Sequence, residues 1–237
     1  MPTRNNAFFR VLIALHFLTS AALAEESSIH GYPAKRSYAP EEEVTFHLSS
    51  SLTKVDVEIA RLGVESKVVW RKGDISVRNH PVPKNASSHG CDWPSAFSVK
   101  IPSTWTSGCY EARARSGETL SNRMFFVVRS SQPGRDTKIL LQLATNTYNA
   151  YNGWGGFSLY TYWGPAHWDK IHEPGDELGR RVSFQRPFTG LDRNWDLPFI
   201  QWAEGNGYEL DYAINSDLEF HPEILEHYQL VLSVGHD

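Results

Sequence analysis

The chain has 237 residues, with 23 basic and 27 acidic side chains and therefore a formal net charge of −4. This balance excludes a nucleic-acid binder that relies on bulk positive charge. A hydrophobic content of 41% excludes a disordered chain, and the length allows one or two domains. Aromatic residues make up 13% of the chain. Such a content is typical of a heavy core, a binding groove or both, and composition does not choose between them.

The first 24 residues have the pattern of a secretory signal peptide. Arg4 and Arg10 form a basic start, residues 11–18 are an apolar run, and Ala22-Leu23-Ala24 is a small-x-small cleavage site. The apolar run is too short to span a bilayer, which takes ~20 residues. The alternative is a buried N-terminal helix. We expect cleavage after Ala24 and a secreted or periplasmic protein.

Residues 25–131 show the alternation of β-strands. Val55, Val57 and Ile59 alternate with charged neighbours, and turn residues separate the runs. The runs are residues 44–48, 55–59, 68–70, 96–101, 110–115 and 125–128. They predict an antiparallel β sandwich (Ig-like), with a long loop over residues 71–95.

A linker over residues 132–136 leads to a different pattern in residues 137–237. Apolar runs typical of a sheet covered on both faces now alternate with helical spacing, which favours a parallel α/β sheet. The predicted elements are strands at 139–143, 208–212 and 230–234, a helix at 195–206 and helical turns at 221–227. The fold class expected is thus α+β with two domains, and we expect the halves to be separable.

The predicted α/β domain is incomplete. Three strands make a small sheet, and Gly235-His236-Asp237 directly follows an apolar strand. Open α/β sheets carry their active sites at the carboxyl ends of such strands. We therefore expect the sequence to be the N-terminal part of a larger domain, a fragment that is inactive by itself.

Several smaller features leave alternatives open. The chain has two cysteines, Cys91 and Cys109, which either form a disulfide or remain two buried thiols. His167 and His172 form a weak metal or acid–base cluster, for which a solvated loop is the alternative. Residues 146–156 combine Asn, Tyr, Trp and Gly after a buried strand, either as a ligand loop or as structural packing. The chain has no GxSxG nucleophile elbow.

The region from Lys138 to Asp237 resembles the C-terminal region of the large (beta) subunit of N,N-dimethylformamidase. The similar stretches are NTYNAYNGWGG (146–156), SLY (158–160), RVSF with RP (181–187), GYELDY (207–212) and LVLSVGHD (230–237), together with WTSGCY (105–110).

This resemblance implies an amide hydrolase that acts on a small amide and holds one iron with two tyrosines and a glutamate. By position the tyrosines are Tyr110 and Tyr151, with Tyr148 as the alternative to Tyr151. The glutamate would follow Asp237 and is thus missing from this chain, so we expect iron to bind weakly or not at all. His236 would be an acid–base residue. A phenolate is a hard anionic ligand that suits ferric iron, and the metal can polarise an amide carbonyl.

A second class of function competes with the hydrolase. In it the chain is a non-catalytic secreted binding protein, whose sandwich and aromatic loop hold a ligand or a partner. Under either hypothesis we expect no nucleic-acid partner, and no membrane partner once the signal peptide is cleaved.

Overall fold

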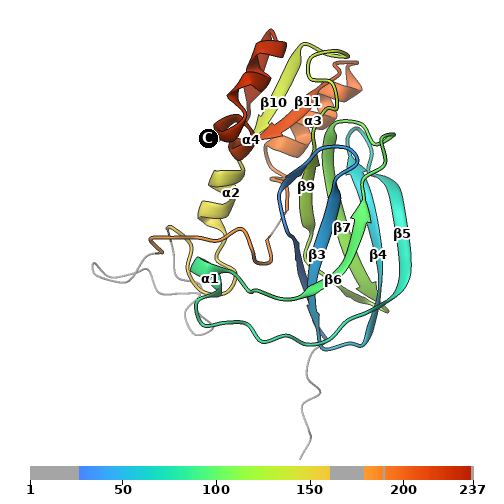
Figure 1. Ribbon diagram of the computed structural model, residues 1–237, viewed down its shortest axis with the longest axis vertical. Helices are drawn as coiled ribbons and strands as arrows, with labels where there is room; N and C mark the ends of the chain where they lie inside the picture. Colours follow the sequence, from blue (N-terminus) through green and yellow to red (C-terminus); the bar gives the residue numbers. More distant parts are fainter. Residues whose placement is uncertain (1–26, 161–178, 189, 236–237) are drawn as a thin grey trace, which may run out of the picture.

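The computed structural model describes residues 27–160, 179–188 and 190–235. Three β-sheets and a few short helices form these residues, which confirms an α+β architecture (Figure 1). Two packed sheets form the N-terminal part, here the two-sheet unit (residues 29–128). A third sheet with its helices forms the parallel unit (residues 139–233), which lies above it in the figure.

The two-sheet unit has strand orders β1-β3-β6 and β2-β9-β7-β4-β5, with β8 beside β7. All neighbours are antiparallel except the short parallel pair of β2 and β9. The strands are β1 (Ile29–Pro33), β2 (Ser37–Tyr38), β3 (Glu43–Ser50), β4 (Lys54–Leu62), β5 (Lys67–Ser76), β6 (Ser95–Lys100), β7 (Gly108–Ser116), β8 (Thr119–Leu120) and β9 (Met124–Val128).

One core lies between the two sheets. Alternation along β4 turns Val55, Val57 and Ile59 inward, and Phe46 of β3 and Phe126 of β9 join them. The predicted loop over residues 71–95 needs correction, because β5 runs to Ser76 and a short helix, α1 (Ala86–His89), lies within the rest. The run at 68–70 predicts only the first part of β5, because the exposed residues of its second part are mostly polar on this edge strand, so alternation is weak.

The parallel unit has strand order β11-β10-β12, with both neighbours parallel to β10, as the apolar runs predict. Its elements are β10 (Ile139–Leu143), α2 (Thr145–Tyr151), α3 (Asp196–Gly205), β11 (Asp211–Ile214), α4 (Asn215–Phe220), a 3-10 helix η1 (Pro222–His227) and β12 (Leu230–Ser233). The expectation that β12 is buried is wrong: it is an edge strand, and Leu230 and Val231 are about half exposed.

The parallel unit shares a second core with the two-sheet unit. Cys109 of β7 and Phe125 and Val127 of β9 point away from the first core and pack with Leu141 and Tyr212 of the parallel unit. The Arg129 guanidinium also lies 2.8 Å from an Asp217 carboxylate oxygen across the same boundary. Residues on both sides of the predicted linker therefore share one core, and whether the halves can be separated stays a prediction.

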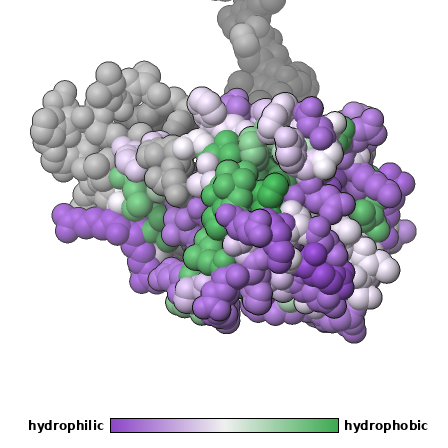
Figure 2. Space-filling view, turned by 90° about the horizontal axis from the view of Figure 1, so that it is seen from above, coloured by the Kyte–Doolittle hydropathy of each residue, from purple (hydrophilic) through white to green (hydrophobic). Residues whose placement is uncertain are grey.

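The outer surface of the parallel unit carries several exposed apolar side chains. Seen from the end of the molecule that holds this unit, hydrophobic residues gather in a band across the middle of the face (Figure 2). Large exposed hydrophobic residues of this unit are Tyr151, Tyr160, Trp195, Trp202, Tyr208, Phe220, Leu225, Leu230 and Val231. Within the described residues, the helices are all too short or too polar to cross a membrane.

Candidate functional site

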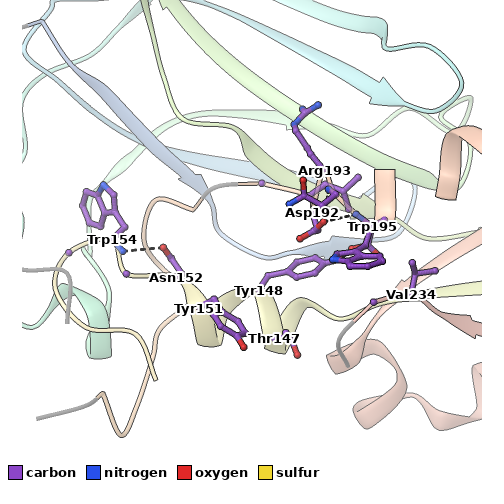
Figure 3. A pocket seen from close by; sticks show the side chains of 16 residues that line it. Thr147, Tyr148, Tyr151, Asn152, Trp154, Asp192, Arg193, Trp195 and Val234 are labelled. Carbon is purple, nitrogen blue, oxygen red and sulfur yellow. Dashed lines mark hydrogen bonds between the residues drawn. The ribbon is translucent and has the colours of Figure 1, made fainter. Parts of the chain in front are cut away.

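A cleft of 930 Å³ opens where the parallel strands end. One wall is α2 with the loop after it, the other is the segment from Gly190 to Asp196, and Val234 and Gly235 after β12 close a third side (Figure 3). The carboxyl edge of a parallel sheet is where α/β folds place their ligands. The cleft therefore lies where the strand pattern predicts an active site.

The first wall is a helix where the sequence suggests a loop. Ala144 occupies the N-cap position of α2 and offers no capping side chain. The cap comes instead from Asn215 at the start of α4, whose side-chain oxygen accepts hydrogen bonds from the Asn146 amide at 2.9 Å and the Thr145 hydroxyl at 3.3 Å. A cap supplied from so far along the chain cannot be seen in the local sequence.

Helix α2 presents two tyrosines to the cleft. Tyr148 turns inward, stacks on Phe188 with ring centroids 6.2 Å apart, and donates its hydroxyl hydrogen to the Asp196 carboxylate. Tyr151, one helical turn later, is 52% exposed and stacks on Tyr160 at 4.4 Å. One ring is therefore part of the floor of the cleft, and the other stands at its rim (Figure 3).

The loop after α2 is held in place from within. The Asn152 side chain donates to the Pro187 carbonyl at 3.0 Å and accepts from the Trp154 amide at 3.2 Å, the contact drawn in Figure 3. Arg186, which is fully buried, donates to the carbonyls of Asn152, Trp154 and Phe157. This part of the aromatic loop is thus a rigid wall, whose side-chain amide is already used in structural bonds.

The second wall leads into α3. Asp192 accepts the backbone amides of Asn194 at 2.7 Å and Trp195 at 2.8 Å, which fixes the turn before the helix. The Trp195 ring is 62% exposed and faces the cleft with Tyr148, whereas the Arg193 side chain turns away from it (Figure 3). The cleft therefore has aromatic walls and carboxylates on one side.

Asp196 is the polar group at the floor. It is 1% exposed, and burial raises its pKa to about 6, against the lowering effect of the Tyr148 hydrogen bond. Burial and the neighbouring carboxylate also raise the pKa of Tyr148. The second oxygen of Asp196 has no hydrogen-bond partner among the described residues. The pair can therefore hold a proton and still accept a further hydrogen bond. Sequence reasoning missed Asp196, because a single Asp at a helix start is usually only a cap.

The predicted site residues lie in different places. Tyr151 lines the cleft, as does the alternative Tyr148. Tyr110 instead lies on the inner face of β7, 1% exposed, where it stacks on Trp105 and donates its hydroxyl to the Thr106 carbonyl at 2.8 Å. Burial raises the Tyr110 pKa to about 12. The structure does not bring Tyr110 and Tyr151 together, and His236 lies outside the described residues.

Other predicted features resolve more simply. Cys91 and Cys109 are two separate buried thiols, in different clusters of the core, which favours the thiol alternative over the disulfide. His167 and His172 lie outside the described residues. Among the residues that are described, His, Cys, Asp and Glu side chains nowhere gather in a metal-binding group of three.

Comparison with known protein families gives a match over residues 56–237, to the model described as N,N-dimethylformamidase beta subunit-like, C-terminal. A comparison with curated proteins gives no match. The family match begins inside β4 and includes both walls of the cleft, so it covers the second core as well as the candidate site. Since the match covers well over half of the chain, the protein belongs to the N,N-dimethylformamidase beta subunit-like family.

Proposed function

We propose that this chain is an exported C–N hydrolase-like protein, which takes a small amide into the cleft between α2 and the segment 190–196. The observation that carries the proposal is the coincidence of the family match with a cleft at the carboxyl edge of the parallel sheet. The export rests on the N-terminal sequence, which lies outside the described residues.

The residues of the cleft suit a small, partly apolar amide. The rings of Tyr148, Tyr151 and Trp195 offer apolar contact to alkyl groups. At the floor, the Tyr148 hydroxyl holds one oxygen of Asp196, and the other oxygen is buried and unpartnered, so it would accept a hydrogen bond from a ligand N–H or O–H group once the carboxylate turns toward the cleft. The cleft would therefore orient a substrate by its polar group and exclude water with its aromatic walls.

An iron ion is what the family resemblance implies, and its tyrosine ligands can be tested against the structure. Tyr110 and Tyr151 do not fit as a pair in this arrangement, because Tyr110 faces the core between the two sheets and its hydroxyl is already bonded. Tyr148 and Tyr151 lie on one helix, and both line the cleft. The Tyr148 hydroxyl is likewise bonded, to the Asp196 carboxylate, so these two tyrosines share the cleft but a metal would have to displace that contact.

Tyr110 has a structural role that supports an Ig-like arrangement of the two sheets. It stands near the start of β7, and its hydroxyl bonds a carbonyl four residues upstream, in Thr106. The same contact, the tyrosine corner, recurs in Ig-like sandwiches. We propose the Ig-like assignment for the two-sheet unit on this basis.

The test is to measure binding and turnover separately on the exported protein supplied with ferrous or ferric salt. Binding of short N-alkyl amides is followed by the fluorescence of exposed Trp195, and turnover by release of the amine. We expect binding, reduced at least 10-fold by Asp196→Asn, with Tyr208→Phe as the control outside the cleft, and little or no release from these 237 residues, which the sequence predicts to be inactive by themselves. Release once a family segment that carries the implied glutamate is appended would favour the hydrolase. Binding without release in that longer chain would favour the non-catalytic binding protein, and no binding of any amide would overturn both.

A further inference from the structure

A cluster of charged residues lies behind the second wall of the cleft, on the outer face of β7. Glu111 is 6% exposed and accepts a hydrogen bond from Arg193 at 2.9 Å, and its other oxygen lies 3.2 Å from the Nε of Arg123. Because side chains alternate along a strand, Arg113 shares this face of β7 with Glu111. Three guanidinium groups therefore surround one buried carboxylate.

The positive charge of this cluster exceeds what its carboxylates neutralise. Glu58 lies opposite Arg113 in the register of β4 and β7 and lines the same hollow, but its carboxylate is paired with Arg71 at 3.5 Å. Arg113 makes one long hydrogen bond, to the Ser121 carbonyl at 3.4 Å. Burial and the like charges of Arg193 and Arg113 lower the pKa of Arg123. Repulsion among the arginines is thus only partly relieved within the described residues.

The three arginines line a hollow of 270 Å³, separate from the cleft, together with the carboxylates of Glu58 and Glu111, and Ser66 and Gln201 are among its other polar walls. This volume suits a small ion with a few waters. We propose that this hollow is a binding site for a small doubly charged oxyanion, a phosphate or sulfate group, held by Arg113, Arg123 and Arg193. Planar guanidinium groups match the paired oxygens of such anions and bond them strongly.

The proposed site connects to the cleft through Arg193. The guanidinium of Arg193 belongs to the charged cluster, while its backbone lies in the wall segment that carries Trp195. Gly190 makes this close approach feasible: its φ is +94°, and a Cβ there would lie 3.0 Å from the Cβ of Arg123. An anion would compete with Glu111 for Arg193. Its binding would therefore alter the contact that holds this wall of the cleft against β7.

Glu111 gives the proposal an unusual test, since the carboxylate competes with the anion for the same guanidinium groups. The full chain is titrated with inorganic phosphate and with sulfate by calorimetry, at an ionic strength held constant with chloride. Arg113→Gln should weaken binding about 10-fold or more, whereas Glu111→Gln should tighten it. Arg115→Gln is the matched control, on the same face of the same strand but away from Glu111.

The outcomes separate a built site from general surface charge. Phosphate or sulfate binding that falls with Arg113→Gln and survives Arg115→Gln supports the proposal, whether or not Glu111→Gln folds. Equal losses in the two arginine variants would overturn it, because any basic surface would then serve. No binding beyond that of chloride, or acetate binding as tight as phosphate, would also overturn it. Circular dichroism of each variant confirms that the fold is intact.

Discussion

The two-sheet unit and the parallel unit solve the problem of burying apolar surface in different ways. The two-sheet unit closes its core with its own strands, since both inner faces come from the N-terminal half. The parallel unit does not: its core is completed by Cys109, Phe125 and Val127, from the outer face of β7 and β9. Alternation gives each of these strands two apolar faces, so one sheet serves two cores.

This difference extends to the candidate site. The wall that includes α2 belongs to the parallel unit, whereas the opposite wall is tied to the two-sheet unit by the contact of Arg193 with Glu111. The width of the cleft therefore depends on how the units are docked. The predictions below test this dependence, beginning with the largest effect.

Cutting the chain between the units should destroy the parallel unit and spare the two-sheet unit. Residues 137–237 alone lose four buried partners, Leu62 and the three residues from β7 and β9. At about 2 kcal/mol for each, the loss equals the whole stability of a typical domain. Residues 25–131 alone should fold but expose Phe125 and Val127.

Circular dichroism with thermal melting of the two segments checks this prediction. Replacing Phe125 and Val127 by Ser and Thr in the 25–131 segment should raise its solubility without lowering its melting temperature, because these side chains face the missing unit. A cooperatively melting 137–237 segment would contradict the shared-core account.

Two adjacent phenylalanines allow a finer comparison. Phe125 faces the parallel unit and Phe126 faces the core between the sheets, and both are fully buried. Each change to Ala should cost about 3–5 kcal/mol. Phe126→Ala should reduce hydrogen-exchange protection throughout the chain. Phe125→Ala should reduce it first in β10 and β11 and leave β3 protected. Equal loss of protection in β3 for both variants would show that the units unfold as one.

The sequence predicts some of these elements well because their signals are local. Alternation in β4 and the unbroken apolar run of β10 identify strands on both sides of the boundary, and the spacing in residues 195–206 predicts α3 almost to the residue. The parallel direction of the C-terminal sheet follows from the same pattern.

What the sequence misses depends on distant partners. Helix α2 has its cap in Asn215, and β12 is an edge strand whose side chains are largely exposed among the described residues. The sequence predicts a site at the carboxyl ends of these strands, where the structure has a cleft lined by Tyr148 and Tyr151, but Asp196 is recognised only from its contact with Tyr148 in the fold. The metal-ligand assignment of Tyr110 and Tyr151 stays a prediction, because it rests on resemblance and not on a contact.

Asp196 at the junction should make stability depend on pH. Its pKa is raised to about 6 in the folded state from about 3.9 in the unfolded chain, so the folded state binds more protons between these values. Stability should therefore fall as pH rises through this window, by about 3 kcal/mol in total. Asp196→Asn should remove the cost and stabilise the protein at pH 8 but not at pH 3.5.

Denaturant unfolding at a series of pH values measures this effect. Tyr148→Phe is the matched control: it removes the donor that lowers the Asp196 pKa, so it should steepen the dependence on pH that Asp196→Asn removes. If the free energy of unfolding changes by the same amount between pH 4 and pH 7 in the wild type and in both variants, groups other than Asp196 govern this range.

The smallest expected effect is on stability, and it distinguishes Tyr110 from Tyr151. The family resemblance implies that both are iron ligands, and one lies in each unit. Tyr110→Phe removes the hydroxyl bonded to the Thr106 carbonyl and should cost about 1 kcal/mol, whereas Tyr151→Phe at the exposed rim should cost less than about 0.5 kcal/mol. The same variants are titrated with ferric iron and followed by the visible absorption of tyrosinate bound to iron.

If the ligand pair implied by resemblance is correct, either change abolishes the band. If the two units keep these side chains apart, as in this structure, any band survives Tyr110→Phe and is lost in Tyr151→Phe or Tyr148→Phe. A band that Tyr110→Phe abolishes, in a variant whose melting temperature is nearly unchanged, would mean that β7 presents Tyr110 to the cleft, and that the boundary between the units is drawn in the wrong place.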